Sequence, residues 1–147
     1  MHDLAHDTAA ALDFKMPDAR AGDLSENIAL ALATRIDMKA SAEVLIRDIN
    51  AIDGARSEAI EIRDSFAHIA AEVSRKIRDI ERKYWTPTQK VTQIERAYKM
   101  DEDHARLNTL ADRCKASVET CDYCLRVLSD KSYRLGQLLS VKLHHTP

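Results

Sequence analysis

A stripe of positions between Leu24 and Tyr84 constrains the fold more than any other feature of the sequence. Its 18 positions are separated by steps of four and three residues in strict alternation, and 15 of them are uncharged. The mean step is about 3.5 residues, which is the repeat of helices that wind around a partner helix. A β-strand would instead show a period of two. The stripe therefore predicts a long helix that packs on another helix.

Residues 81–91, ERKYWTPTQKV, are expected to reverse the chain direction after this first arm. The order Thr86-Pro87-Thr88-Gln89 resembles a helix capping box, with Pro87 at the first helical position, where a missing amide costs nothing. Arg82 and Lys83 precede it, and cations suit the C-terminal end of a helix. We therefore expect a sharp turn at Trp85–Pro87.

A second stripe with a mean step of about 3.5 residues runs from Met100 to Leu139. It follows a slip in phase at the acidic residues 101–103, which are expected to open a new helix because acidic side chains favour a helix N-terminus. The two arms, about 24–84 and 87–142, have similar lengths, as in a helical hairpin.

The fold class predicted from these patterns is all-α, a long antiparallel helical hairpin or coiled-coil-like bundle of two to four long helices. Additional apolar residues beside the first stripe favour either a folded-back bundle or pairing with a second copy. Gly54 leaves two alternatives open, a continuous helix or a turn. We expect residues 1–23 to form a flexible segment and linker, residues 24–142 one helical domain, and residues 143–147 a frayed end.

Charge and hydropathy exclude several classes of protein. The formal net charge of −2 gives no general basic surplus for nucleic acid. The longest purely apolar run, residues 28–33, is far shorter than the ~20 residues that span a bilayer. The N-terminus shows no secretory signal, and the odd number of cysteines suits a reducing compartment. We expect a cytoplasmic protein, although export without a signal stays open.

His104 is the first candidate for chemistry. Residues 104–110, HARLNTL, resemble the phosphoacceptor box of one class of bacterial histidine kinases, H-R-V-K-N-T-L. His104, Asn108, Thr109 and Leu110 match that box, whereas the three residues between His104 and Asn108 differ from it. The resemblance implies histidine phosphotransfer. The alternative is a partly buried histidine near a helix start.

Cys121 and Cys124 form the second candidate, as a C-x-x-C pair. Such a pair is redox-active when a helix N-terminus or a cation lowers the pKa of a thiol, and a zinc site needs four converging ligands. Here the pair lies within a helical pattern, and Cys114 is too far along it to share a metal. Small core side chains are the alternative explanation, and we expect no cofactor or metal.

Four residues are candidates for contact with a partner. Arg35, Arg56 and Arg63 interrupt the first stripe, so their stems either pack while their heads reach solvent or a carboxylate, or they set register and partner choice. Trp85 stands one residue past the stripe and either packs over the turn or is exposed for binding.

These patterns predict a non-enzymatic helical protein–protein interaction module, such as an adaptor, chaperone, stalk or self-assembling scaffold. Its expected partners are proteins, with a homodimer as the simplest assembly. A histidine phosphotransfer or metal- or redox-linked bundle that uses His104 or the Cys121–Cys124 pair is the alternative.

Overall fold

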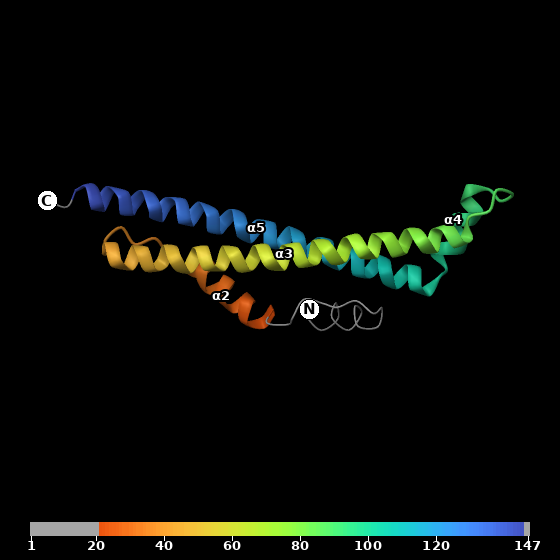
Figure 1. Cartoon of the computed structure of the whole chain (residues 1–147), viewed down its shortest axis with the longest axis horizontal. Helices are drawn as coiled ribbons and strands as arrows, with labels where there is room; N and C mark the ends of the chain where they lie inside the picture. The colour runs from red at the N-terminus through yellow and green to blue at the C-terminus, as the bar shows by residue number, and fades with distance from the viewer. Residues whose placement is uncertain (1–20, 146–147) are drawn as a thin grey trace. The chain divides into compact units, whose positions relative to one another are not determined.

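The computed structural model of the chain describes the backbone of residues 21–145 and the side chains of residues 26–145. Every regular element in this part of the chain is a helix (Figure 1). The predicted all-α class is therefore confirmed, whereas most of the segment 1–23 lies outside the described residues. The helices are α2 (Ala21–Ala33), α3 (Ala42–Tyr84), α4 (Val91–Lys99) and α5 (Glu102–His144).

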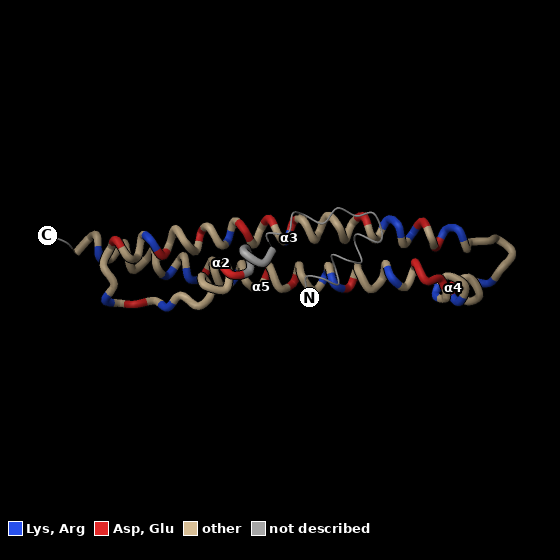
Figure 2. The backbone as a smooth tube through the Cα atoms, turned by 90° about the horizontal axis from the view of Figure 1, so that it is seen from below, with Lys and Arg blue, Asp and Glu red and all other residues tan. Residues whose placement is uncertain are grey.

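The described residues form two compact units, to both of which α3 and α5 contribute. Unit 1 contains residues 64–118, and unit 2 contains residues 21–63 and 119–145. Acidic and basic residues alternate along α3 and α5 (Figure 2), as expected for helices with one solvated face. None of the described helices is long and apolar enough to cross a membrane.

Unit 2 is built from α2, the first part of α3 and the last part of α5. Ser132 pairs with Asp53 and Arg63 pairs with Asp122, so the residue number rises by ten along α3 while it falls by ten along α5. The two helices are therefore antiparallel here. The buried core residues are Ala31, Ala40, Leu45, Ile52, Ala55, Leu128 and Leu135.

Unit 1 is built from the end of α3, from α4 and from the start of α5. Tyr84 pairs with Asp101 and Glu81 with His104, again in antiparallel register. This pairing is the hairpin that the two stripes predict. Its buried cluster consists of Ile69, Val73, Leu107, Leu110 and Cys114.

The first long helix does not break at Gly54, which lies inside α3. The chain leaves the helical conformation instead between α2 and α3, at residues 34–41, so the prediction of one stripe from residue 24 is wrong there. Asp37 Oδ1 accepts the Lys39 N–H at 2.9 Å, and Ser41 Oγ accepts the Val44 N–H at 3.3 Å. Both bonds offer the backbone an alternative to the helix.

The chain reverses after α3 as predicted, but the expected capping box does not form. The next helix, α4, begins at Val91, and its N-cap Lys90 makes no side-chain capping bond. Pro87 and Thr88 form a turn, and the buried hydroxyl of Thr86 has no hydrogen-bond partner among the described residues. Proline suits the second position of a turn as well as the first position of a helix, and here the turn prevails.

The predicted helix start at the acidic residues 101–103 is confirmed. Asp101 Oδ1 accepts the backbone N–H groups of Asp103 at 2.9 Å and of His104 at 3.1 Å, which makes Asp101 the N-cap of α5. The helix continues to His144, so residues 143–144 are helical rather than frayed. Residues 146–147 lie outside the described part of the chain.

Candidate functional site

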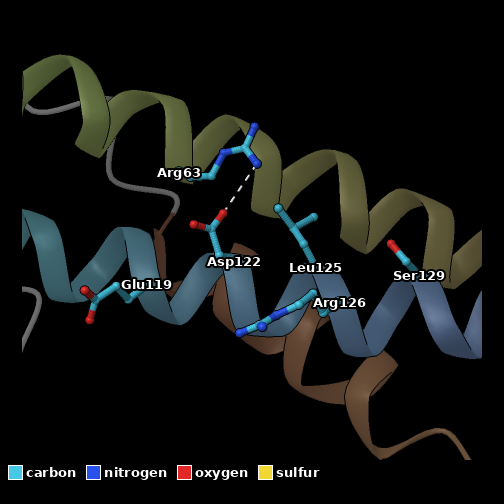
Figure 3. A pocket seen from close by; sticks show the side chains of 6 residues that line it. All are labelled: Arg63, Glu119, Asp122, Leu125, Arg126 and Ser129. Carbon is cyan, nitrogen blue, oxygen red and sulfur yellow. Dashed lines mark hydrogen bonds and ion pairs between the residues drawn. The ribbon is translucent and has the colours of Figure 1, made fainter.

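A groove between α3 and α5 in unit 2 consists of two adjoining hollows. They have volumes of about 670 Å³ and about 470 Å³ and share Ser129. Figure 3 shows the larger one, with α3 and α5 on its two sides. Arg63, Glu119, Asp122, Leu125, Arg126 and Ser129 line the larger hollow. Arg56, Ser129, Ser132, Tyr133, Gly136, Gln137 and Ser140 line the smaller one.

Small side chains on α5 explain why the groove is hollow. Ser129, Ser132, Gly136 and Ser140 follow one another at steps of three and four residues, so they lie on one face of the helix. Their short side chains leave the space beside α3 unfilled. This spacing was visible in the sequence but was not singled out there, and it is the signal that could have located the groove.

Two of the predicted interaction residues lie on this groove. Arg63 Nη1 is 3.4 Å from Asp122 Oδ1, and Arg56 Nη1 is 3.5 Å from Asp53 Oδ1. Both arginines thus pack their stems and direct their heads to a carboxylate, as one of the two sequence interpretations expects. Arg35 does not join them, because it is exposed in the connection between α2 and α3. Their roles in partner binding stay predictions.

The opposite side of the α3–α5 pair in unit 2 is covered by α2. The Asn27 side-chain amide donates to Glu58 Oε1 at 3.3 Å. The ammonium group of Lys131 donates to the carbonyl oxygens of Leu32 and, at 2.9 Å, of Thr34. Because α2 binds to one side only, the groove side has no covering helix among the described residues.

Large apolar side chains are exposed on the uncovered side. Ile46, Asp53 and Ile60 recur every seven residues of α3 and therefore share a face, and Asp53 accepts the Ser132 hydroxyl at 3.0 Å. Ile46 and Ile60 are both exposed, and Tyr133 beside the smaller hollow is 65% exposed. We call the set Ile46, Asp53, Ile60, Ser132, Tyr133 and Gly136 the groove face.

Trp85 lies in unit 1, outside this groove. It is the first residue after α3 and is 65% exposed, so it does not pack over the turn. Of the two alternatives that the sequence leaves open, the structure therefore retains the exposed one.

His104 is buried in unit 1, with only 6% of its surface exposed. Its Nδ1 lies 3.0 Å from the Asn108 amide nitrogen and its Nε2 lies 3.2 Å from Glu81 Oε1. The Tyr98 ring packs on it at a centroid distance of 4.9 Å. The Asn108 amide can donate to Nδ1, and an Nε2–H can donate to Glu81. Phosphoryl transfer requires an accessible ring nitrogen, and both nitrogens here are engaged, so nothing in this geometry favours that alternative.

The start of α5 is held by a hydrogen bond from the Tyr84 hydroxyl to Asp101 Oδ2 at 2.6 Å. This bond, followed by the bond from the His104 backbone amide, lowers the pKa of Asp101 below its ordinary value of 3.8. The same bond raises the pKa of Tyr84 above 10.0. Both shifts favour an ionised Asp101 next to a protonated Tyr84. The hydrogen bond between these two side chains links the end of α3 to the start of α5.

The three cysteines of the chain lie in α5. All three are free, and burial is the main cause that raises the pKa of Cys114 and of Cys121 above 9.0. A raised pKa keeps the thiol protonated and unreactive. Within the described range 26–145, no three His, Cys, Asp or Glu side chains form a group that could hold a metal ion.

Comparisons with known proteins do not assign the chain to a family. No protein-family model, curated protein sequence or solved structure matches the chain. The function proposed below therefore rests on the geometry of the chain itself.

Proposed function

We propose that the chain is a non-enzymatic helical protein–protein interaction module that self-associates through the groove face of unit 2. The observation that carries the proposal is the one-sided cover of the α3–α5 pair. Helix α2 packs on one side, whereas the other side is hollow and exposes Ile46, Ile60 and Tyr133. A helix from outside the chain would fill the hollow and remove these side chains from water.

A second copy of the chain is the occupant that the groove face suits best. A two-fold interface brings the same surface of both copies together, so every group must meet its complement on that surface. The groove carries both signs of charge, with Arg63 and Arg126 near Glu119 and Asp122. Two copies in antiparallel orientation can therefore place unlike charges opposite each other.

The small residues of α5 support the same arrangement. Gly136 lies in a helix interior, where glycine costs about 1 kcal/mol relative to alanine. Beyond its chain neighbours and the backbone of its own helix turns, a Cβ atom added there would meet no described atom within 4 Å, so no described contact within the chain requires a glycine. Close approach of a helix from a second copy would use the space that Gly136 and the neighbouring serines leave open. Tyr133 would act as the aromatic anchor beside it.

Substitution of Tyr133 tests the proposal. Tyr133→Lys places a charge at the centre of the groove face, and we expect it to weaken self-association at least ten-fold, since aromatic anchors contribute about 2 kcal/mol or more. Size-exclusion chromatography with light scattering over a concentration series measures this change in the mass of the full chain.

Tyr123→Lys is the matched control, because Tyr123 is also an exposed tyrosine of α5 in unit 2 but lines neither hollow. It should leave association unchanged. Equal effects of the two substitutions, or a mass unaffected by Tyr133→Lys, would exclude the groove face as the interface.

A further inference from the structure

The corner where α3 passes into α4 exposes apolar and basic side chains together. The connection between the helices spans residues 85–90, and α4 follows directly (Figure 1). All of the residues concerned belong to unit 1. We call the following set the corner surface: Lys83, Trp85, Lys90, Val91, Arg96, Lys99 and Met100.

The apolar members of this surface are highly exposed. Trp85 begins the connection and is 65% exposed, and Val91 begins α4 and is 70% exposed. Met100, the C-cap of α4, is 85% exposed. Side chains exposed to this extent contribute little to the packing of unit 1.

The outward face of α4 lies opposite the face whose residues point inward. Ile94 is buried and Tyr98 is half-buried against the His104 ring, so these two side chains hold α4 on unit 1. Arg96, Lys99 and Met100 are three and four residues apart and are all exposed. They share the outward face of the helix, because residues at this spacing are neighbours on a helix surface.

The charge of this region is strongly basic although the chain as a whole is slightly acidic. Residues 82–99 contain five Lys or Arg and a single acidic residue, Glu95, whereas the chain has a formal net charge of −2. Arg82 lies 3.8 Å from Asp79. The other four basic side chains make no ion pair with any residue in the described part of the chain. Figure 2 shows the basic residues at the end of α3 and on α4.

Of the three acidic residues that follow α4, Asp101 and Glu102 are engaged by the start of α5, whereas Asp103 is exposed. Asp101 accepts the Tyr84 hydroxyl and caps α5, and Glu102 Oε2 lies 3.9 Å from the Arg106 guanidinium. Both carboxylates are thus engaged by the start of α5. The cations of the corner surface remain available to an anionic partner.

We propose that the corner surface binds the surface of an anionic phospholipid membrane. The indole of Trp85 and the side chain of Met100 enter the boundary between headgroups and acyl chains, while the basic side chains meet the lipid phosphates. Apolar side chains combined with Lys and Arg are the pattern of proteins that lie on a membrane without crossing it.

A membrane suits this surface better than an acidic protein does. A protein partner would have to supply pockets shaped to the side chains of the corner surface. At the corner the apolar side chains protrude. A fluid bilayer accepts protruding side chains without a matching shape. The proposal does not depend on self-association, which concerns other residues.

Tryptophan fluorescence tests the proposal directly, because Trp85 is the only tryptophan in the chain. The full chain is mixed with vesicles of phosphatidylcholine and phosphatidylglycerol, or of phosphatidylcholine alone. We expect a blue shift of the emission and co-sedimentation with the anionic vesicles only. Both should weaken as salt is added, because salt screens exposed charges.

The triple substitution Lys83→Gln, Lys90→Gln and Lys99→Gln should weaken binding roughly 100-fold, since each basic residue near an anionic surface contributes about a five-fold change in affinity. The matched control, Lys39→Gln, Arg47→Gln and Lys115→Gln, removes the same charge from exposed positions outside the corner surface. It should have much less effect.

Three results would overturn the proposal: no blue shift with anionic vesicles at low salt, equal binding to neutral vesicles, or equal losses in the two triple variants. Binding of polyglutamate through the corner residues without binding of vesicles would also overturn it, in favour of an acidic protein. Circular dichroism of each variant verifies that its helices are intact.

Discussion

At the scale of single residues, Asp101 links the reversal of the chain to its C-terminal helix, α5. One carboxylate oxygen accepts the Tyr84 hydroxyl and the other accepts two backbone amides of α5. An ionised carboxylate is a much better acceptor of these bonds than a protonated one. Asp101 therefore couples the stability of unit 1 to pH.

The sign of this coupling follows from the lowered pKa of Asp101. Its contribution to stability is complete above the ordinary value of 3.8 and is lost as the pH falls through the lower pKa of the folded state. We predict that Asp101→Asn destabilises the chain near neutral pH and that the difference from the unaltered chain shrinks toward pH ~2. Urea unfolding over a pH series measures this difference in the free energy of unfolding.

Asp112→Asn is the control for this experiment, because Asp112 is an exposed residue of α5 in the same unit. It should show little change at any pH in this range. A difference for Asp101→Asn that stays constant from neutral to acid pH would show that the carboxylate charge is not involved.

At the scale of elements, α3 shows how far a sequence repeat predicts a continuous helix. The chain passes through Gly54 without a break, and beyond its neighbours and the backbone of its own helix turns a Cβ atom there would meet no described atom within 4 Å. We predict that Gly54→Ala stabilises the chain by about 0.5–1 kcal/mol, because alanine lowers the entropy of the unfolded chain and fits the helix. Thermal or urea unfolding gives the value. A destabilised variant would mean that the chain turns at Gly54.

The docking of α2 depends on a lysine of another helix. Lys131 of α5 donates to the carbonyl groups of Leu32 and Thr34 and thereby caps the C-terminal end of α2, where a positive charge also suits the helix dipole. We predict that Lys131→Met lowers the free energy of unfolding by about 1 kcal/mol. It should also speed hydrogen exchange in α2 more than in α4.

Lys115→Met, at an exposed position of α5 in unit 1, is the control for this substitution and should change neither quantity. Equal hydrogen-exchange rates in α2 with and without Lys131 would mean that the apolar contacts of α2 alone hold this helix in place.

The stripes predicted the helices well where the repeat and the packing coincide. Every position of the first stripe from Ala42 to Tyr84 is buried or half-buried. The prediction failed at residues 34–41 because Arg35 and Met38 keep the phase of the repeat although the backbone there is not helical. Local signals, the turn at Asp37 and the N-cap at Ser41, outweighed the periodicity.

The candidate site was predictable only in part. The charges of Arg56 and Arg63 mark them within an apolar stripe, and both lie on the groove. The hollow itself depends on which side of the α3–α5 pair α2 covers, and this is decided by tertiary contacts such as Lys131 to Thr34. Sequence periodicity carries no information about that choice.

At the scale of the whole molecule, each unit carries a separate surface for a proposed partner. We propose that the groove face of unit 2 binds a second copy and that the corner surface of unit 1 binds an anionic membrane. The two proposals involve different residues and different forces. Substitutions at Tyr133 should therefore leave vesicle binding by the monomer intact, and substitutions at Lys90 should leave self-association intact.

Sedimentation equilibrium of the unaltered chain, from low to high micromolar concentration, tests the central claim most directly. A groove face that binds a second copy predicts a mass that approaches twice the 16.6 kDa of one chain as the concentration rises. A mass that stays at 16.6 kDa over the whole range would contradict self-association and leave the groove face without its proposed occupant.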